Sequence, residues 1–326
     1  MKSSLIIFLW IALMTVGCGS KPPEKKPDAI NIAFQGWIGY SPFYLGRDLG
    51  FFKDEGIELN IVNEQLDSAR RDAFIAGMLD AEAGTLDLLV SKRGQGALIV
   101  SVMEIDYSFG ADGIVAMDNI QTLADLKGKK VVLSKNDVSD MFLSYLFHEQ
   151  GLSRDDVAVI AKRPDEVAAA FVNGEGDAAV TWEPELSAAA KRPGSRVFLT
   201  SKDQPGFIVD TLNVRQDLAV RNPDLVRRLM RGWFRSMRYA KEHPVEAARL
   251  TAKYYGITQA EYQNQIAGLK WVDYKEQNTP ANFAKWRDVL NLIVSIKSGQ
   301  AGSSSQINAV EVINPTLLQK LYENIR

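Results

Sequence analysis

The chain is poor in the residues that most catalytic and metal sites require. Its 326 residues include one cysteine, Cys18, and two histidines, His148 and His243, and none of the three is spaced with another as in a zinc site. No G-x-S-x-G elbow, P-loop or G-x-G-x-x-G following a strand is present. We therefore expect no internal disulfide, metal site, cofactor or catalytic residue, and we do not expect an enzyme.

A strong excess of one charge is also missing. The formal net charge is −2, from 38 basic and 40 acidic residues, which argues against a nucleic-acid-binding surface built on bulk basicity. The composition, 46% hydrophobic and 24% charged, is that of an ordinary globular protein. At about 100–200 residues per domain, the length predicts two domains and a sizeable core.

The apolar run at the N-terminus, Leu5–Val16, is too short to cross a membrane, which takes ~20 residues. Lys2 precedes the run and small residues follow it, as in a signal peptide. Thr15-Val16-Gly17-Cys18 resembles the bacterial lipoprotein cleavage site, with Thr15 in place of the usual leucine. We therefore expect residues 1–18 to be a lipoprotein signal peptide with Cys18 as the lipidation site. The alternative is a signal peptide cleaved elsewhere, with an incidental cysteine. Residues 19–28, GSKPPEKKPD, predict a flexible tether.

The segment Asn31–Ile61 predicts a strand, a loop, a short helix, a turn and a second strand. Ser41 can cap the helix, with Pro42 at its first position. The loop before Ser41 then lies at the carboxyl end of the first strand, where open α/β sheets bind ligands. Its aromatic residues could equally be partly buried packing residues. The loop residues that we expect to contact a ligand are Trp37, Gly39, Tyr40 and Ser41.

Other acidic and aromatic side chains follow predicted strands. Asp106 and Asp112 flank an apolar, glycine-rich turn, where carboxylates usually need a partner. The alternative is that they cap turns and face water. Trp182 and Glu183 follow the strand Gly176–Val180 as a platform for stacking and hydrogen bonding. Ser139 lies where a helix begins, so its neighbouring amides could receive an anion.

Four motifs together resemble one family. They are the opening GWIGYSPFYLGRDLGFFKDEGIEL, Gly110-Ala111-Asp112-Gly113-Ile114, Leu126-Lys127-Gly128-Lys129-Lys130-Val131, and Thr181-Trp182-Glu183-Pro184. The chain resembles periplasmic substrate-binding proteins that serve ABC importers of aliphatic sulfonates, taurine, nitrate and thiamine-pyrimidine precursors. Phe109 stands where this family commonly has asparagine.

The resemblance implies an α/β fold of the two-lobed periplasmic binding protein type (type II), with a ligand cleft between lobes joined by two hinge crossings. We expect residues 28–117 plus 213–326 to form lobe 1 and residues 118–212 to form lobe 2, with crossings near Ile114–Asn119 and Asp210–Val214. The resemblance also implies that the ligand-binding residues include Thr85, Asp106, Tyr107, Asp112, Trp182, Glu183 and Asp210.

The function that this resemblance implies is delivery of a small organic nutrient to an ABC permease and its ATPase. We expect a monomer at the periplasm or cell surface, lipid-anchored to a bacterial membrane. Helix N-termini favour a sulfonate-like or taurine-like anion or zwitterion. The acidic and aromatic residues favour a pyrimidine, a riboflavin-like compound or an amine. A ligand sensor and a pyrimidine-synthase-like enzyme are the remaining alternatives; the missing second cysteine disfavours the enzyme.

Overall fold

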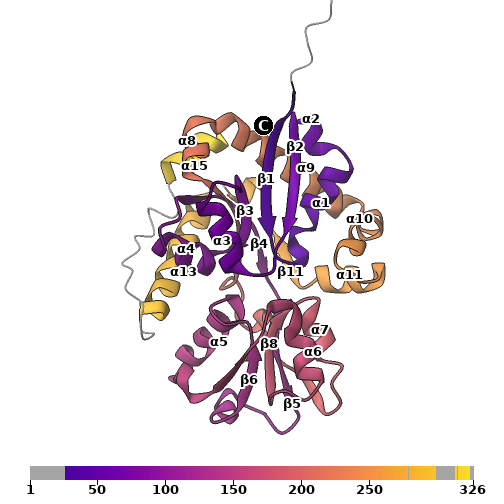
Figure 1. Cartoon of the computed structure of the whole chain (residues 1–326), viewed down its shortest axis with the longest axis vertical. Helices are drawn as coiled ribbons and strands as arrows, with labels where there is room; N and C mark the ends of the chain where they lie inside the picture. Colours follow the sequence, from indigo (N-terminus) through magenta and orange to yellow (C-terminus); the bar gives the residue numbers. More distant parts are fainter. Residues whose placement is uncertain (1–25, 278, 299–312, 314, 324–326) are drawn as a thin grey trace, which may run out of the picture.

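The computed structural model describes residues 26–277, 279–298, 313 and 315–323. It has two α/β lobes, each built around its own sheet and arranged one above the other along the longest axis (Figure 1). The two-lobed α/β architecture predicted from the sequence is therefore confirmed. In the described part of the chain, no helix is long and apolar enough to span a membrane.

The sheet of the first lobe combines parallel and antiparallel strands. β1, β2 and β3 run parallel, as the strand-helix-strand pattern of the opening segment predicts. β10 returns from the second lobe and lies antiparallel between β3 and β4. The strand order is β11 (Leu269–Trp271), β4 (Ile99–Ser108), β10 (Val209–Arg215), β3 (Ala81–Thr85), β1 (Asp28–Phe34) and β2 (Ile57–Asn63).

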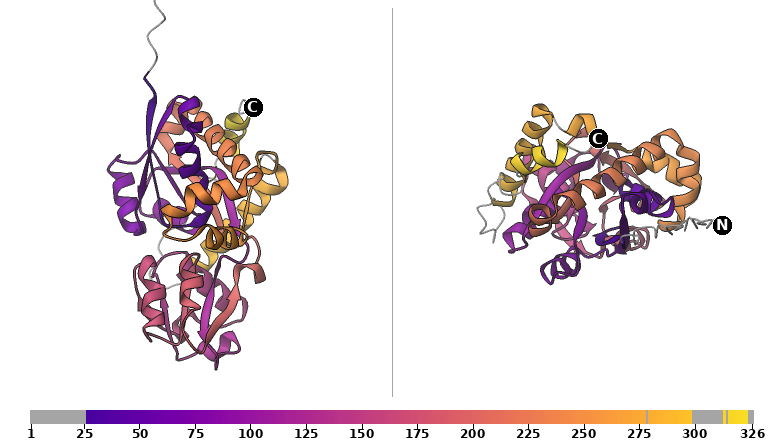
Figure 2. Two further views of the ribbon diagram at one scale, coloured as in Figure 1. Left: turned by 90° about the vertical axis from the view of Figure 1, so that its right-hand side faces the viewer. Right: turned by 90° about the horizontal axis from the view of Figure 1, so that it is seen from above.

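Helices cover both faces of this sheet (Figure 2). On one face α1 packs against α9, and the rings of Phe43 and Trp233 lie 4.5 Å apart between centroids. α1 begins at Ser41, one residue earlier than the sequence suggests. The helices of this lobe are α1 (Ser41–Asp48), α2 (Phe51–Asp54), α3 (Asp67–Ile75), α4 (Leu86–Gly94), α8 (Gln216–Arg221), α9 (Pro223–Glu242), α10 (Pro244–Thr251), α11 (Gln259–Ile266), α12 (Tyr274–Gln277), α13 (Pro280–Ser298) and α15 (Pro315–Tyr322), with 3₁₀ turns η1 (Ile38–Tyr40) and η6 (Ala252–Tyr254).

The second lobe is smaller. Its sheet has the order β7 (Ala158–Ala161), β6 (Lys130–Leu133), β8 (Ala178–Trp182), β5 (Asp112–Met117) and β9 (Ser195–Thr200). Asp137 caps the main helix of this lobe by accepting a hydrogen bond from Val138 N. The helices are α5 (Val138–Glu149), α6 (Val167–Val172) and α7 (Glu185–Ala189), with 3₁₀ turns η2 (Leu123–Leu126), η3 (Arg154–Asp156), η4 (Pro164–Glu166) and η5 (Ser201–Asp203).

The two crossings between the lobes lie earlier in the chain than the sequence suggests. Residues 109–111 join β4 to β5, and residues 201–208 join β9 to β10. Ser108 and Ser201 link the crossings through their hydroxyl groups, 2.6 Å apart. The strand at 112–117 therefore belongs to the second sheet, and the strand at 209–215 belongs to the first. Both lobe boundaries thus lie before the expected positions, 117/118 and 212/213. Both segments are strands within a sheet rather than hinge crossings, and nearly all their residues are buried.

Candidate functional site

Two aspartates face each other across neighbouring strands of the first sheet. Asp106 of β4 and Asp210 of β10 are register partners in an antiparallel pair. In such pairs the Cβ atoms of opposed residues are about 4.5–5.5 Å apart. The two residues are 0% and 2% exposed. Their carboxyl groups therefore share one small, dry volume where the first lobe meets the crossings; we call these residues the aspartate pair.

Two aromatic residues of the opening loop donate hydrogen bonds to the aspartate pair. Nε1 of Trp37 lies 3.2 Å from Oδ1 and 3.3 Å from Oδ2 of Asp106. The hydroxyl of Tyr40 donates to Oδ1 of Asp210. Both aromatic side chains are buried. They therefore hold the carboxyl groups in place and pack the interior at the same time, as the packing interpretation expected, whereas their contact with a ligand stays a prediction.

The loop itself is fixed by contacts from α11 and the segments beside it. The hydroxyl of Tyr255 donates to the carbonyl of Trp37 at 3.1 Å, and Nε1 of Trp271 donates to the carbonyl of Gly39 at 2.8 Å. Ser41 shares a 2.6 Å hydrogen bond with the hydroxyl of Tyr262. The loop therefore presents a preorganised pair of donors to the aspartates.

Asp112 brings a third buried carboxylate from the second lobe. It begins β5 and is the register partner of Trp182 on β8. The backbone N–H of Asp112 donates to the hydroxyl of Ser108 at 3.2 Å, but its Oδ2 has no hydrogen-bond partner within the described residues. The carboxylate is therefore available for a group that the chain does not supply.

The three carboxyl groups are held toward their neutral form. Burial raises the pKa of Asp106 well above its usual range, and the charge of Asp210 raises it further. Burial also raises the pKa of Asp210, against the opposing hydrogen bond from Tyr40. The pKa of Asp112 is raised to about 7, mainly by burial. In the described part of the chain, none of the three forms an ion pair with a lysine or arginine.

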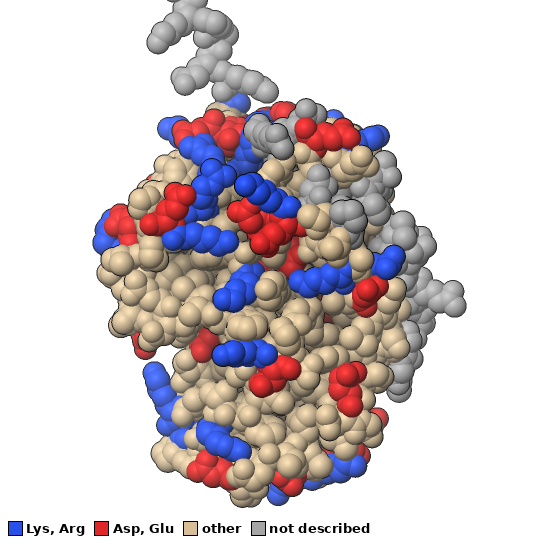
Figure 3. All heavy atoms as spheres, turned by 180° about the vertical axis from the view of Figure 1, so that it is seen from behind, with Lys and Arg blue, Asp and Glu red and all other residues tan. Residues whose placement is uncertain are grey.

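A cavity of about 140 Å³ opens between the lobes, and its lining includes neighbours of the three carboxyl groups but not the carboxyl groups themselves. Trp182, the register partner of Asp112, lines it from the second lobe, and Tyr255, which binds the Trp37 carbonyl, lines it from the first. Seen from behind, the surface is notched between the two lobes (Figure 3). The lining residues are Gly36, Asn63, Gln65, Tyr254 and Tyr255 of the first lobe and Pro164, Asp165, Trp182, Pro184 and Glu185 of the second.

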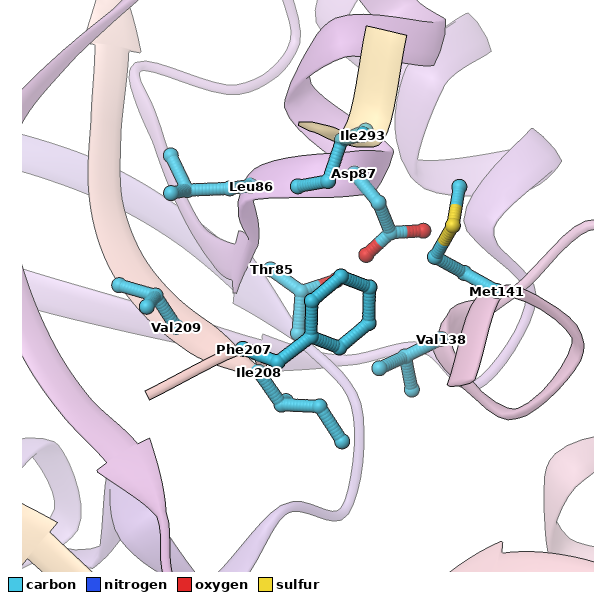
Figure 4. A pocket seen from close by; sticks show the side chains of 9 residues that line it. All are labelled: Thr85, Leu86, Asp87, Val138, Met141, Phe207, Ile208, Val209 and Ile293. Atoms are coloured by element: carbon cyan, nitrogen blue, oxygen red, sulfur yellow. The ribbon is translucent and has the colours of Figure 1, made fainter. Parts of the chain in front are cut away.

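A second, smaller cavity of about 10 Å³ is lined in part by Val209, the residue before Asp210. Thr85, the register partner of Asp210 on β3, lines it. Asp87 of α4 points its carboxylate into an otherwise largely apolar space (Figure 4). Its Oδ2 has no hydrogen-bond partner within the described residues, and burial raises its pKa. The lining residues are Thr85, Leu86, Asp87, Val138, Met141, Phe207, Ile208, Val209 and Ile293.

The helix start that we expected to receive an anion already carries one. Ser139 is buried in the first turn of α5, but the preceding Asp137 accepts the N–H of Val138 at 2.7 Å. Asp140 in the same turn accepts the N–H of Asn136. Among the residues that the structure describes, the two cavities are lined by the acidic residues Asp87, Asp165 and Glu185 and by no lysine or arginine.

Three of the expected ligand residues point elsewhere. Tyr107 lies on the opposite face of β4 from Asp106, because side chains alternate along a strand, and Nζ of Lys285 lies 4.3 Å from its ring centroid. Glu183 accepts hydrogen bonds from Ser187 N and Oγ and so caps α7. Ser41 is turned to Tyr262. Two of the other expected residues line a cavity: Thr85 the smaller one and Trp182 the larger one. The remaining ones are buried and line neither cavity: Trp37, Gly39, Tyr40, Asp106, Asp112 and Asp210 around the aspartate pair, and Ser139 in the first turn of α5. Cys18 lies outside the described residues.

Sequence reasoning missed several residues of the site. Asp87 directly follows the Thr85-Leu86 turn, so a carboxylate in the first turn of a helix beside an expected ligand residue was the available signal. Asp137 directly precedes a helix, so its only local signal is that of a helix cap. Tyr254, Tyr255 and Gln65 carry no local signal, because they reach the cleft only through the packing of the two lobes.

Comparison with known proteins identifies the family of the chain. The NMT1/THI5 like family model matches residues 37–247, which include both crossings and the whole second lobe. A Bacillus subtilis (strain 168) protein named as an aliphatic sulfonates-binding protein is 32% identical over 267 residues, 77% of this chain and 77% of that protein. A Haemophilus influenzae protein named as a thiamine biosynthesis protein is 23% identical over 282 residues, 84% of this chain and 82% of that protein.

Solved structures agree on the fold. The periplasmic aliphatic sulphonate binding protein SsuA from Escherichia coli superimposes with a TM-score of 0.72 at 20% sequence identity, covering 91% of this chain and 99% of that chain. The family suggested by the sequence motifs is thus confirmed by the matched family model and by the relatives. The chain belongs to the NMT1/THI5 like family and has the two-lobed fold of the periplasmic binding proteins.

Proposed function

We propose that the protein binds a small organic solute between its two lobes and delivers it to an ABC importer. Membership of the family and the sulfonates-binding name of a 32% identical relative support a solute-binding role. The larger cavity, lined from both lobes by aromatic and polar residues, supports a ligand enclosed by lobe closure. We further propose that the protein releases its solute unchanged rather than converting it.

The ligand that the site supports best carries a protonated nitrogen. The single observation behind this proposal is the set of three buried carboxyl groups, Asp106, Asp112 and Asp210, that have no basic partner within the described residues. A buried carboxylate is costly unless a positive charge or hydrogen bonds compensate it. An ammonium group or a protonated nitrogen heterocycle would supply both. Because Asp112 comes from the other lobe, the same cation would favour closure.

A taurine-like zwitterion meets this requirement and remains a candidate. Its ammonium group would bind the carboxyl groups, and its sulfonate would lie in the larger cavity beside the amide side chains of Asn63 and Gln65. A simple anion such as nitrate has less support, because Asp137 occupies the start of α5. Pyrimidines and amines, which the acidic residues suggested from the sequence, are the other candidates.

We propose that Cys18 carries a lipid, that residues 19–28 tether the folded part to a bacterial membrane, and that the protein works as a monomer with a permease and an ATPase. This proposal rests on the Thr15-Val16-Gly17-Cys18 motif and on the proline-rich segment after it. Mass spectrometry of the mature N-terminal peptide tests it. A diacylglycerol-modified Cys18 is expected, and an unmodified N-terminus at another residue would contradict the anchor.

Thermal unfolding against a matched set of compounds tests the ligand class. Taurine has an amine and a sulfonate, ethylamine only the amine, and ethanesulfonate only the sulfonate. A ligand at about 1,000 times its Kd stabilises a protein by about 4 kcal/mol. We expect the amine-bearing compounds to raise the unfolding temperature and ethanesulfonate to leave it unchanged. A shift with ethanesulfonate alone would contradict the proposed class.

A further inference from the structure

We propose that Asp106 and Asp210 share one proton in the ligand-free protein and release it when the cationic group of the solute binds, so that solute binding is coupled to pH. This inference rests on the proposed function, because it takes the ligand to be a cation. On binding, the O–H bond of the protonated aspartic acid breaks and the proton passes to the solvent. The ligand keeps its own N–H bonds, and its positive charge takes the place of the charge of the released proton.

The geometry of the aspartate pair requires a proton or another positive charge. The two residues are opposed in the β4–β10 register and are almost completely buried. The side chains that donate to them, Trp37 to Asp106 and Tyr40 to Asp210, are both neutral. Two carboxyl groups that share a dry site do not both ionise readily, and they titrate as a pair.

The charged groups that surround the aspartate pair do not supply this positive charge. Asp112 from β5 and Asp87 from α4 add negative charge. Glu104 of β4 is already bound by Nε1 of Trp286 at 2.6 Å. Two nearby basic groups are bound to other side chains: the guanidinium of Arg70 of α3 binds Glu82 at 3.1 Å and Gln35 at 2.6 Å, and Nζ of Lys285 of α13 lies 3.3 Å from Oε1 of Glu104. The titratable and charged groups facing the pair are Tyr40, Arg70, Asp87, Glu104, Asp112 and Tyr255.

The coupling has a definite direction. Burial raises the pKa of both members of the pair, which favours retention of the shared proton in the ligand-free protein. A ligand that must expel this proton binds more tightly as the pH rises. With one proton released per ligand, the Kd falls about tenfold for each pH unit over which the free pair stays protonated. Acidification therefore weakens binding and releases the bound solute.

Infrared difference spectroscopy of the purified protein at pH 8 tests this inference directly. The carbonyl stretch of a protonated carboxyl group is separate from that of a carboxylate, so it reports the shared proton. Asp112, with a pKa raised to about 7, is mostly ionised at this pH. We expect the protonated-carboxyl band in the wild type and in the control Asp72→Asn, which removes an exposed carboxylate, and its loss in Asp106→Asn and Asp210→Asn.

The probe for the ligand step is taurine or ethylamine, whichever raises the unfolding temperature. Saturation with the probe should remove the band, and calorimetry in buffers of different ionisation enthalpy should show release of one proton. A ligand-free protein without the band, or a band that persists when the probe is bound, would overturn the inference. If no amine binds, the proposed ligand class fails, while the band in the ligand-free protein still reports the shared proton.

Discussion

Gly39 and Asp106 are so close that no side chain fits between them. A Cβ atom on Gly39 would lie 2.2 Å from Oδ2 of Asp106 and 2.3 Å from Nε1 of Trp37. Ordinary van der Waals contacts of a Cβ atom begin near 3.4 Å. The missing side chain at Gly39 is therefore what allows the indole of Trp37 to reach the carboxyl group. The opening loop and the end of β4 form one preorganised unit.

Gly39→Ala should disrupt the contact between the opening loop and the end of β4. The added methyl group must displace the buried Trp37 or Asp106, and overpacking of this kind costs about 1–3 kcal/mol. We expect lower stability in urea unfolding together with weaker ligand binding. Gly36→Ala in the same loop is the matched control for stability, because its nearest neighbour atoms are 3.6 Å away. Equal stabilities of the two variants would contradict the role of Gly39.

Asp112 should make the ligand-free protein less stable as the pH rises. Its pKa is raised from 3.8 to about 7 in the folded state, so the folded protein binds the proton more tightly than the unfolded chain does. The resulting stability is present at acidic pH and is lost as the pH rises from about 4 to about 7. The Asp112→Asn variant has no carboxyl group to titrate here. We therefore expect its free energy of unfolding to increase relative to that of the wild type as the pH rises from about 4 to about 7. Urea unfolding at pH 5 and pH 8 measures the difference, and a constant difference would refute the buried titration.

Arg70→Ala should be far more destabilising than Arg71→Ala. The guanidinium of Arg70 is fully buried and binds Glu82, Asp67 and Gln35. Removing one partner of a buried ion pair costs about 3–5 kcal/mol because the other charge stays buried. The neighbouring Arg71 is paired with the exposed Asp72, and surface changes of this kind stay within about 0.5 kcal/mol. Comparable losses of free energy of unfolding in the two variants would show that the Arg70 network does not stabilise the first lobe.

Trp182→Ala should weaken solute binding without unfolding the protein. Trp182 lines the larger cavity from the second lobe and lies next to Asp112 across the β5–β8 ladder. Removing its ring takes away contact area of the closed cleft, whereas Trp182→Phe keeps an aromatic face. We expect a larger increase in Kd for the alanine variant than for the phenylalanine variant, with a cooperative unfolding transition in both. Normal binding by the alanine variant would mean that the ligand lies elsewhere.

Much of the fold was predictable because its signals are local. Pro42 at the start of a helix, Asn222 before another, and the capping box of Thr258 and Glu261 each depend on a few neighbouring residues, and all three appear in the structure. The aromatic loop at the end of β1 and Trp182 at the end of β8 were found for the same reason. The motifs also identified the family.

The rest depended on tertiary structure. β4 continues to Ser108 because β10 and β11 pair with its last residues. Within this strand Tyr107 and Asp106 lie on opposite faces, so Asp106 reaches Trp37 while Tyr107 lies against Lys285. Asp87 and Asp210 are far apart in sequence, and their approach follows from the return of β10 beside β3. An excess of buried acid at the cleft could not be read from a chain whose formal net charge is only −2.

The most direct measurement is calorimetric titration of taurine, ethylamine and ethanesulfonate into the wild type, Asp106→Asn and Asp210→Asn at one pH. The account predicts that an amine-bearing compound binds the wild type, that each substitution weakens its binding at least tenfold, and that ethanesulfonate does not bind. Wild-type affinity in both variants, or binding of ethanesulfonate in preference to the amines, would contradict a site organised around the aspartate pair.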